Sequence, residues 1–445
     1  MQVPVIVVLP RQEALRESFE AYVAGGVDVP RLRASVPSRL TLDPFLPAVP
    51  LGTGRLEQAS TAPFDPARSE AFAVRGFIEA PNPAEIPVSI DGAPVFADPR
   101  IDPLPTCDGS PPLGDAAAVA AQLNVSGLAA RGLDGRDVAI AVMDTGINLA
   151  FLNGQLGRAA RFDAANSWTP PGSTIAPGGY PVDHGTMCAF DALIAAPNAT
   201  LVDFPMLSAA GPGGSTVGRS VSVALVAFAQ VLTSWAVAFA SGGLSNYKSL
   251  VLTNSWGIYH PTWDFPTGHP GRYCDNPRHP FNQIVTTLAS SGVDMVFAAG
   301  NCGASCPDMR CAGRTTETIM GANAHPDVLT VAGCDTGNVR VGYSSQGPAI
   351  AGMSAQKPDI TAYTHFLGSQ AFGAGSADSG TSAACPVAAG CVAALRTRTG
   401  RATTPSSSLF AQVRATARPV GVSGWNADCG FGIIDAVAAA GSLGL

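Results

Sequence analysis

The stretch Asp137–Asn148 reads DVAIAVMDTGIN, and it decides the fold. Its residues Val138–Met143 are all apolar, and an ionisable residue, Asp144, follows them directly. A strand that is covered on both faces is apolar at every position, whereas a strand with one wet face alternates. The stretch therefore predicts a central strand of a parallel sheet, with Asp144 at the carboxyl end of that strand.

Further short apolar strands alternate with longer helix-like segments after this stretch. The strands are ATLVDFPML (199–207), LVLTNSWG (250–257), DMVFAAGN (294–301) and DVLTVAGC (327–334), and helices are expected near 184–196, 217–239 and 280–291. Such alternation predicts an α/β fold with a doubly wound, mostly parallel sheet over residues 111–445. Ligands of these sheets bind beyond the carboxyl ends of the strands. The site is therefore expected beside Asp144 and Asn301, each of which follows a strand.

Residues 1–110 have a different character. An apolar strand at Val3–Leu9 precedes a helix-like segment, and two extended stretches follow at Ala71–Ile78 and Pro94–Ile101. This pattern predicts a small N-terminal α+β domain. The segment 105–112, PTCDGSPP, is typical of a linker to the larger domain.

The composition excludes several classes of protein. Hydrophobic residues make up 46% of the 445 residues and charged residues 13%, so a large buried core is expected rather than disorder. The net charge is −7 and no dense Lys/Arg cluster occurs, so nucleic acid is not an expected partner. One longer apolar stretch, Val221–Ala240, is interrupted by polar residues, so we expect a buried helix and no membrane span. The N-terminus does not resemble a signal peptide, which makes the cytoplasm the default location, while ten cysteines leave secretion open.

The cysteines fall into two groups. Cys302, Cys306 and Cys311 cluster in NCGASCPDMRC, where disulfides, a zinc site and free thiols are all open roles. Zinc fits least well, because the spacing is not a clean double C-x-x-C. Other cysteines, such as Cys188 and Cys385, lie in apolar helical segments and are expected to be small core residues.

Four polar residues are the candidates for chemistry. His184 opens a helix in VDHGTMCAFDALIAAP, and Ser382 lies at the start of a small-residue helix in DSGTSAACPVAAGCVAAL. Asp144 and Asn301 each end a strand. Taken singly, each has an ordinary explanation as a turn residue, a helix cap or a surface histidine. Together they supply the nucleophile, the base, the carboxylate that orients the base and the oxyanion donor that acyl transfer requires.

The segments around these residues resemble those of the subtilisin-like serine peptidases (peptidase S8). Four motifs, DTGIN, DHGT, AAGN and SGTSAACP, occur in that family's order and contain Asp144, His184, Asn301 and Ser382. The segments NSWG (254–257) and MLSAAGPGG (206–214) are similar to the family's two cleft-lining segments, and GFGIIDA (430–436) is similar to its closing segment. The resemblance covers about residues 115–440.

The resemblance implies a role for each candidate. Asp144 orients His184, which is the general base and then the acid. Ser382 is the nucleophile, and its backbone amide holds the oxyanion together with Asn301. A polypeptide substrate is expected to bind in extended conformation between two strands. The residues of these substrate-binding strands are Ser255, Trp256 and Gly257 on one side and Gly211 and Gly213 on the other.

No cofactor is implied, and calcium stays open because no clear acidic cluster marks a site for it. A monomer is expected. The domain formed by residues 1–110 resembles, more loosely, the family's inhibitory prodomain, and an unrelated accessory domain is equally open. If it is a prodomain, a cut is expected between about Pro103 and Asp115.

The predicted function is that of a serine endopeptidase. A peptide-maturation protease or transacylase of a biosynthetic cluster uses the same triad, so the sequence does not separate these two functions. An inactive pseudopeptidase that serves as a binding module is disfavoured, because a binder has no need of all four groups. Met187 and Cys188 stand where the family often has a second histidine, outside the proton-transfer chain. Cys385 lies close to the nucleophile, and sensitivity to thiol reagents is expected from it.

Overall fold

The computed structural model describes residues 1–24, 36–52, 65–103, 110–207, 220–236 and 246–445. A seven-stranded sheet, in which all neighbouring strands are parallel, forms the centre of the molecule in the order β15-β14-β13-β11-β8-β10-β9. The strands are β8 (Val138–Met143), β9 (Arg161–Phe162), β10 (Thr200–Phe204), β11 (Ser249–Asn254), β13 (Asp294–Ala298), β14 (Leu329–Cys334) and β15 (Ile360–Tyr363). The predicted α/β fold with a parallel sheet is confirmed.

Helices cover both faces of this sheet. They are α2 (Ala116–Gln122), α3 (Val125–Ala130), α4 (Leu149–Leu156), α5 (His184–Ala195), α6 (Val221–Val231), α8 (Pro280–Ser290), α9 (Thr381–Arg396), α10 (Ser406–Ala415) and α11 (Ala436–Ser442). Successive side chains of a strand point to opposite faces. Accordingly, Ile140 and Val142 of β8 enter the core that contains α5 and α9, whereas Ala139 and Ala141 enter the core that contains α6 and α8. The sheet is therefore doubly wound, as the apolar run of β8 predicted.

The expected helices near 184–196 and 280–291 are found as α5 and α8. The third, expected at 217–239, is found as α6, which continues as a π-helical turn over Leu232–Ala236. The ends of that predicted range, 217–219 and 237–239, lie outside the described residues. Among the helices that the structure describes, none has the length and apolar character needed to cross a bilayer.

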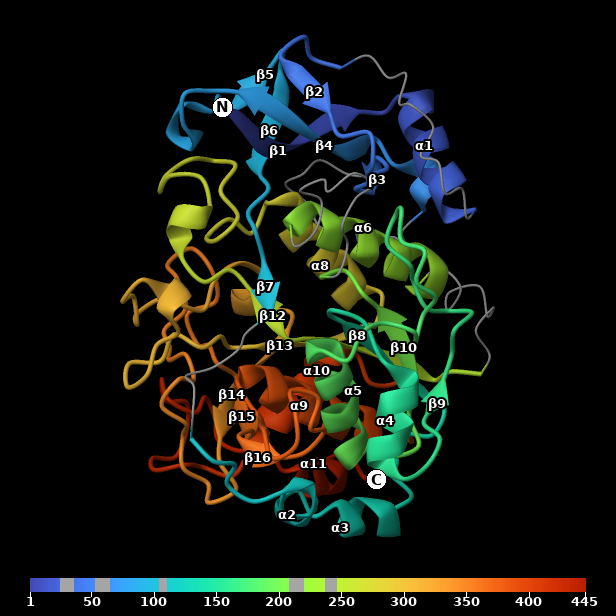
Figure 1. Ribbon diagram of the computed structural model, residues 1–445, viewed down its shortest axis with the longest axis vertical. Helices are drawn as coiled ribbons and strands as arrows, with labels where there is room; N and C mark the ends of the chain where they lie inside the picture. Colours follow the sequence, from blue (N-terminus) through green and yellow to red (C-terminus); the bar gives the residue numbers. More distant parts are fainter. Residues whose placement is uncertain (25–35, 53–64, 104–109, 208–219, 237–245) are drawn as a thin grey trace.

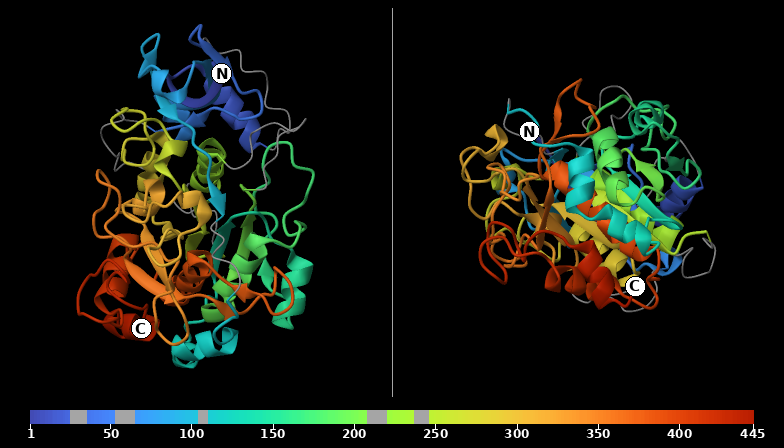
Figure 2. Two further views of the ribbon diagram at one scale, coloured as in Figure 1. Left: turned by 60° about the vertical axis from the view of Figure 1, so that its left-hand side comes forward. Right: turned by 90° about the horizontal axis from the view of Figure 1, so that it is seen from below.

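The N-terminal residues form a separate antiparallel sheet in the order β2-β4-β1-β6-β5, with β3 also paired to β4. Its elements are β1 (Gln2–Pro10), α1 (Glu13–Val23), β2 (Leu40–Leu42), β3 (Val49–Pro50), β4 (Ala71–Glu79), β5 (Ser89–Ile90) and β6 (Ala93–Ala97). One face of this sheet encloses a small apolar core of its own, and the other face contributes Ile6, Val8 and Phe96 to the core of α6 and α8. Figures 1 and 2 show this small sheet at one end of the molecule and the C-terminus at the opposite end. The domain boundary at residue 110 stays a prediction.

The buried carboxylate of Asp98 connects the N-terminal sheet to helix α6 of the larger unit. Asp98 accepts hydrogen bonds from the backbone amide of Ser222 at 2.7 Å and from its hydroxyl at 2.9 Å, so the N-terminal unit caps α6. Arg75 of β4 donates to the same carboxylate at 2.6 Å. The extended stretch predicted at Pro94–Ile101 is therefore interrupted: β6 ends at Ala97, and a two-residue strand β7 (Asp102–Pro103) begins further on.

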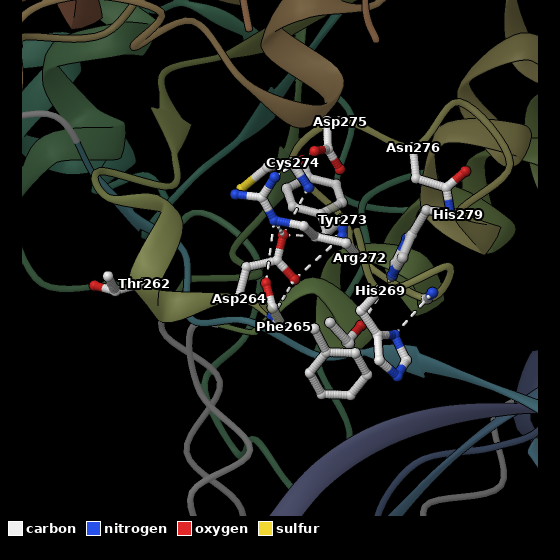
Figure 3. Close-up of polar contacts among 12 residues, drawn as sticks. Thr262, Asp264, Phe265, His269, Arg272, Tyr273, Cys274, Asp275, Asn276 and His279 are labelled. Atoms are coloured by element: carbon white, nitrogen blue, oxygen red, sulfur yellow. Dashed lines mark hydrogen bonds and ion pairs between the residues drawn. The ribbon is translucent and has the colours of Figure 1, made fainter. Parts of the chain in front are cut away.

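The segment 264–279, which precedes α8, contacts the last residue of β6, and polar contacts within this segment are drawn in Figure 3. The carboxylate of Asp264 accepts from the amide of Tyr273 at 2.9 Å and thereby closes the segment into a compact loop. From this loop the carbonyl of Gly271 accepts from the amide of Ala97 at 2.8 Å. His279, which precedes α8, donates from Nε2 to the carbonyl of Ala97 at 2.8 Å. The N-terminal sheet is thus held by hydrogen bonds to the backbone of Ala97 as well as by apolar packing.

Candidate active site

Asp144 and His184 meet at the carboxyl edge of the parallel sheet. Asp144 follows β8, and His184 is the first residue of α5. The distances from His184 Nδ1 to the two carboxylate oxygens of Asp144 are 2.8 and 3.0 Å, and both side chains are buried. Because an ionised carboxylate only accepts hydrogen bonds, Nδ1 carries the proton. Nε2 of His184 is buried and makes no hydrogen bond with the described residues.

The two loops that carry this pair interlock. The hydroxyl of Thr145 accepts from the amide of Gly185 at 2.8 Å, and the hydroxyl of Thr186 accepts from the amide of Asn148 at 2.9 Å. A Cβ on Gly185 would lie 2.6 Å from the carbonyl oxygen of Gly146, so glycine is required for this approach. The motifs around Asp144 and His184 therefore act as one rigid structural unit.

Ser382 lies in the first turn of α9, next to the same site. Its hydroxyl donates to the carbonyl of Ser255 at 3.3 Å, and the hydroxyl of Ser255 donates back to the carbonyl of Ser382 at 2.9 Å. The thiol of Cys188 lies 3.8 Å from Nδ1 of His184 and 3.6 Å from the carbonyl oxygen of Ser382. A single buried side chain thus touches both segments, so the Asp144–His184 pair lies beside the start of α9, although no hydrogen bond from the described residues reaches Nε2 of His184.

Asn301 joins the same group from the end of β13. Its Oδ1 accepts from the backbone amide of Thr381 at 2.9 Å and from the hydroxyl of Thr381 at 3.0 Å. These bonds fix the amide plane and turn the nitrogen end of the Asn301 side chain away from Thr381. Since Thr381 immediately precedes Ser382, the amide is anchored to the helix start that carries the hydroxyl.

The predicted substrate edge is occupied by the chain itself. Trp256 and Gly257 form β12, which pairs antiparallel with Asp102 and Pro103 of β7. Figure 1 shows β7 reaching from the small sheet to β12. The Trp256 side chain is fully buried in an aromatic cluster, so only its backbone takes part in this edge. The residues predicted for the opposite edge, Gly211 and Gly213, lie outside the described residues.

A buried pair of carboxyl groups close to this site was missed from the sequence. Asp191 of α5 and Asp378 of β17 (Ala377–Asp378) are both buried, and burial, with the charge of Asp378, raises the pKa of Asp191 well above its usual range. Asp378 accepts from the hydroxyl of Ser369 at 2.7 Å. Asp191 therefore keeps its proton in the folded protein at pH values where an exposed aspartate has lost it. The one sequence signal was an aspartate inside an otherwise apolar helix.

The cysteines are resolved in part. Cys302 and Cys311 form a disulfide, and Cys306 is also disulfide-bonded, so that role is the right one for the loop cluster. Cys188 and Cys385 are buried free thiols, as expected. Burial raises the pKa of Cys385 to about 11, and thiol reagents attack the thiolate, so its surroundings disfavour the expected sensitivity to such reagents.

One group of potential metal ligands occurs among the described residues. The ligand atoms of Asp144, His184 and Cys188 lie within 4.8 Å of one another. The same carboxylate and imidazole atoms make the Asp144–His184 hydrogen bond. The group thus coincides with the candidate active site. Calcium binding stays open, as it was from the sequence.

Known proteins resemble this chain in sequence and in fold. The model of the subtilase family matches residues 135–432. Three solved structures share the fold. One is a lanthipeptide protease, with 18% identity, a TM-score of 0.51 and coverage of 74% of this chain and 94% of that chain. MycP1 from the ESX-1 type VII secretion system has 18% identity, a TM-score of 0.50 and coverage of 77% of this chain and 90% of that chain. Fervidolysin from Fervidobacterium pennivorans, a keratinolytic enzyme related to subtilisin, has 16% identity, a TM-score of 0.56 and coverage of 99% of this chain and 61% of that chain. No curated protein sequence matches significantly.

Proposed function

Because this chain belongs to the subtilase family and is a serine peptidase of the subtilisin type, we propose that it is an endopeptidase whose triad is Asp144, His184 and Ser382. The observation that carries the proposal is the bond between Nδ1 of His184 and the carboxylate of Asp144 at 2.8 Å, next to the helix start that bears Ser382. This bond fixes the tautomer in which Nε2 is the basic nitrogen.

His184 Nε2 takes the proton of the Ser382 hydroxyl as that oxygen attacks the substrate carbonyl. The oxygen–carbon bond forms, the carbon–nitrogen bond breaks as the tetrahedral intermediate collapses, and the imidazolium gives the proton to the leaving amine. Asp144 stabilises the imidazolium in both steps. Water then hydrolyses the acyl-enzyme by the same proton path. Hydrogen bonds of such sites often tighten only when substrate binds, so the present Ser382–Ser255 bond is compatible with this path.

The oxyanion is held by the side-chain amide of Asn301 and the backbone amide of Ser382. The Oδ1 atom of Asn301 is bound by Thr381, which leaves the nitrogen end as the donor end. The start of α9, a 16-residue helix, adds the positive end of its dipole. Loss of one such donor typically lowers the rate roughly 100- to 1,000-fold.

We further infer that residues 1–110 act as a prodomain whose C-terminal end lies on the substrate edge. The pairing of Asp102 and Pro103 with β12 supports this role, because a substrate strand is proposed to take the same edge. Sequencing of the N-terminus of the active protein is expected to find a cut between about Pro103 and Asp115. An active chain that still begins at Met1 would contradict this part of the proposal.

Labelling with a fluorophosphonate probe tests the enzyme. Wild type and the control Ser407→Ala, an exposed position on α10, are expected to be labelled, whereas Ser382→Ala is not. The rate of peptide hydrolysis in Ser382→Ala is expected to fall about a million-fold. Labelling of Ser382→Ala at the wild-type level would remove Ser382 from its role, and absence of labelling in wild type would favour the pseudopeptidase.

A further inference from the structure

Arg310 faces the strand that lies on the substrate edge. Its Nη1 atom lies 3.5 Å from Oδ2 of Asp102, whose side chain is only 1% exposed. Asp102 is the residue of β7 that pairs with Gly257 of β12. A guanidinium group of the peptidase unit thus meets an acidic side chain that is presented by the strand on this edge.

Arg310 is held by groups that do not belong to that strand. Its Nε and Nη2 donate to the carboxylate of Asp308 at 2.9 and 3.0 Å, and Nη2 also donates to the hydroxyl of Tyr259 at 2.7 Å. The guanidinium carbon lies 3.8 Å from the centroid of the Tyr259 ring.

The loop around Arg310 is fixed as well. The disulfide between Cys302 and Cys311 closes it, and the amide of Asp308 donates to the carbonyl of Asn301 at 2.9 Å. Because the guanidinium is positioned in advance, it loses little freedom when a peptide binds. Nη1 of this guanidinium is the atom that faces Asp102 of the strand on the edge.

The strand register gives the position of this contact in a substrate. In the antiparallel pair, Asp102 lies opposite Gly257, so a peptide that runs two residues further comes opposite Ser255. The carbonyl oxygen of Ser255 is 3.3 Å from Oγ of Ser382, so the peptide residue at that point presents its carbonyl to the nucleophile. The residue opposite Gly257 is therefore the third residue on the acyl side of the bond that is cleaved.

We propose that Arg310 selects polypeptide substrates with an acidic residue at this third position, an inference that rests on the proposed peptidase function. Arg100 also contacts Asp102, from Nε to Oδ1 at 3.0 Å, but it belongs to the same segment and leaves with it when a substrate takes the edge. Asp308 neutralises part of the charge of Arg310, which keeps the preference moderate. An aspartate is expected to exceed an asparagine about tenfold in kcat/KM.

Two fluorogenic peptides that differ only in Asp or Asn at the third position test the proposal, with the cut located by mass spectrometry. Wild type is expected to prefer the Asp peptide about tenfold. Arg310→Gln is expected to lose the preference, so that its kcat/KM values for the two peptides become equal. The matched control Arg314→Gln removes an equal charge from a residue that is paired with Glu317 at 3.1 Å, and it keeps the preference. A wild type without the preference, or an Arg310→Gln protein that retains it, would overturn the proposal.

Binding of the same peptides to Ser382→Ala gives a reading that needs no turnover. Competition from β7 affects both peptides equally and cancels in the ratio of the two dissociation constants, measured by fluorescence anisotropy. Tighter binding of the Asp peptide that depends on Arg310, together with a wild type that cleaves neither peptide, would refute the peptidase function and support the subsite. Equal binding of the two peptides, with intact hydrolysis, would refute the subsite alone.

Discussion

Acid is expected to destabilise the attachment of the N-terminal sheet through one histidine. His279 is fully buried between the rings of Phe96 and Tyr273, with centroid distances of 5.7 and 5.1 Å. Its Nε2 donates to the carbonyl of Ala97, and its Nδ1 accepts from the amide of Phe281 at 3.3 Å. Both bonds together need the neutral ring. Burial lowers the pKa of His279 to about 4, from an ordinary value of 6.5.

The direction follows from proton uptake. Below pH 6.5 the unfolded chain binds a proton at His279 that the folded chain refuses until about pH 4, so the free energy of unfolding falls as the pH is lowered through this window. Each pH unit of the window costs about 1.36 kcal/mol. Between pH 7.5 and pH 5.0 the loss that is due to His279 is therefore about 2 kcal/mol.

The assay is urea unfolding at pH 7.5 and 5.0, followed by tryptophan fluorescence. Ser382→Ala is the background, so that the chain stays intact. His279→Gln keeps a side-chain N–H donor but does not titrate, and it is expected to lose about 2 kcal/mol less than its parent over this range. Other histidines contribute equally to the pH dependence of parent and variant, so their contributions cancel in the comparison. One of them is His325, whose pKa burial lowers to about 3. Equal losses in parent and variant would refute the reasoning.

Two further predictions concern packing and the carboxyl pair. A Cβ on Gly271 would lie 2.0 Å from the carbonyl oxygen of Val95, so Gly271→Ala is expected to lower the free energy of unfolding by about 1–3 kcal/mol. The control Gly154→Ala, in open space on α4, is expected to raise the free energy of unfolding by up to about 1 kcal/mol. Urea midpoints measure both changes, and an unchanged midpoint in Gly271→Ala would contradict the described contact between the loop and β6. The raised pKa of Asp191 means that its stabilising effect is present below the ordinary pKa and is lost as the pH rises. Asp191→Asn is therefore expected to gain stability relative to wild type from pH 4 to pH 8. Parallel pH profiles of thermal unfolding for the two proteins would contradict the raised pKa.

The fold was predictable where the sequence pattern is long enough to show a period. The central strand β8 is apolar at six successive positions because both of its faces are covered, and α5 begins at His184 as expected. The strands β2, β3 and β5 have two or three residues each and carry no period, so the N-terminal sheet was predicted with too few strands.

The candidate site was predictable because a motif marks each of its four residues. No sequence motif indicates the contacts that join segments far apart in the chain. Asp191 and Asp378 meet only after α5 packs on α9, and Arg310 reaches Asp102 only after β7 pairs with β12. Contacts of this kind depend on the tertiary arrangement, since neither partner's local sequence specifies the other.

The contacts that hold the N-terminal sheet to the larger unit determine whether a cut after β7 releases the proposed prodomain. The small sheet shares an apolar core with α6 and α8, caps α6 through Asp98, and is bound by the loop that contains Gly271. None of these contacts depends on the covalent link that follows Pro103. A cut between about Pro103 and Asp115 therefore frees the end of the strand on the substrate edge, while the sheet stays bound as a separate chain. Full release needs a second event that acts on the interface. Protonation of His279 is one such event, because it removes the acceptor at Nδ1 and places a charge between two aromatic rings.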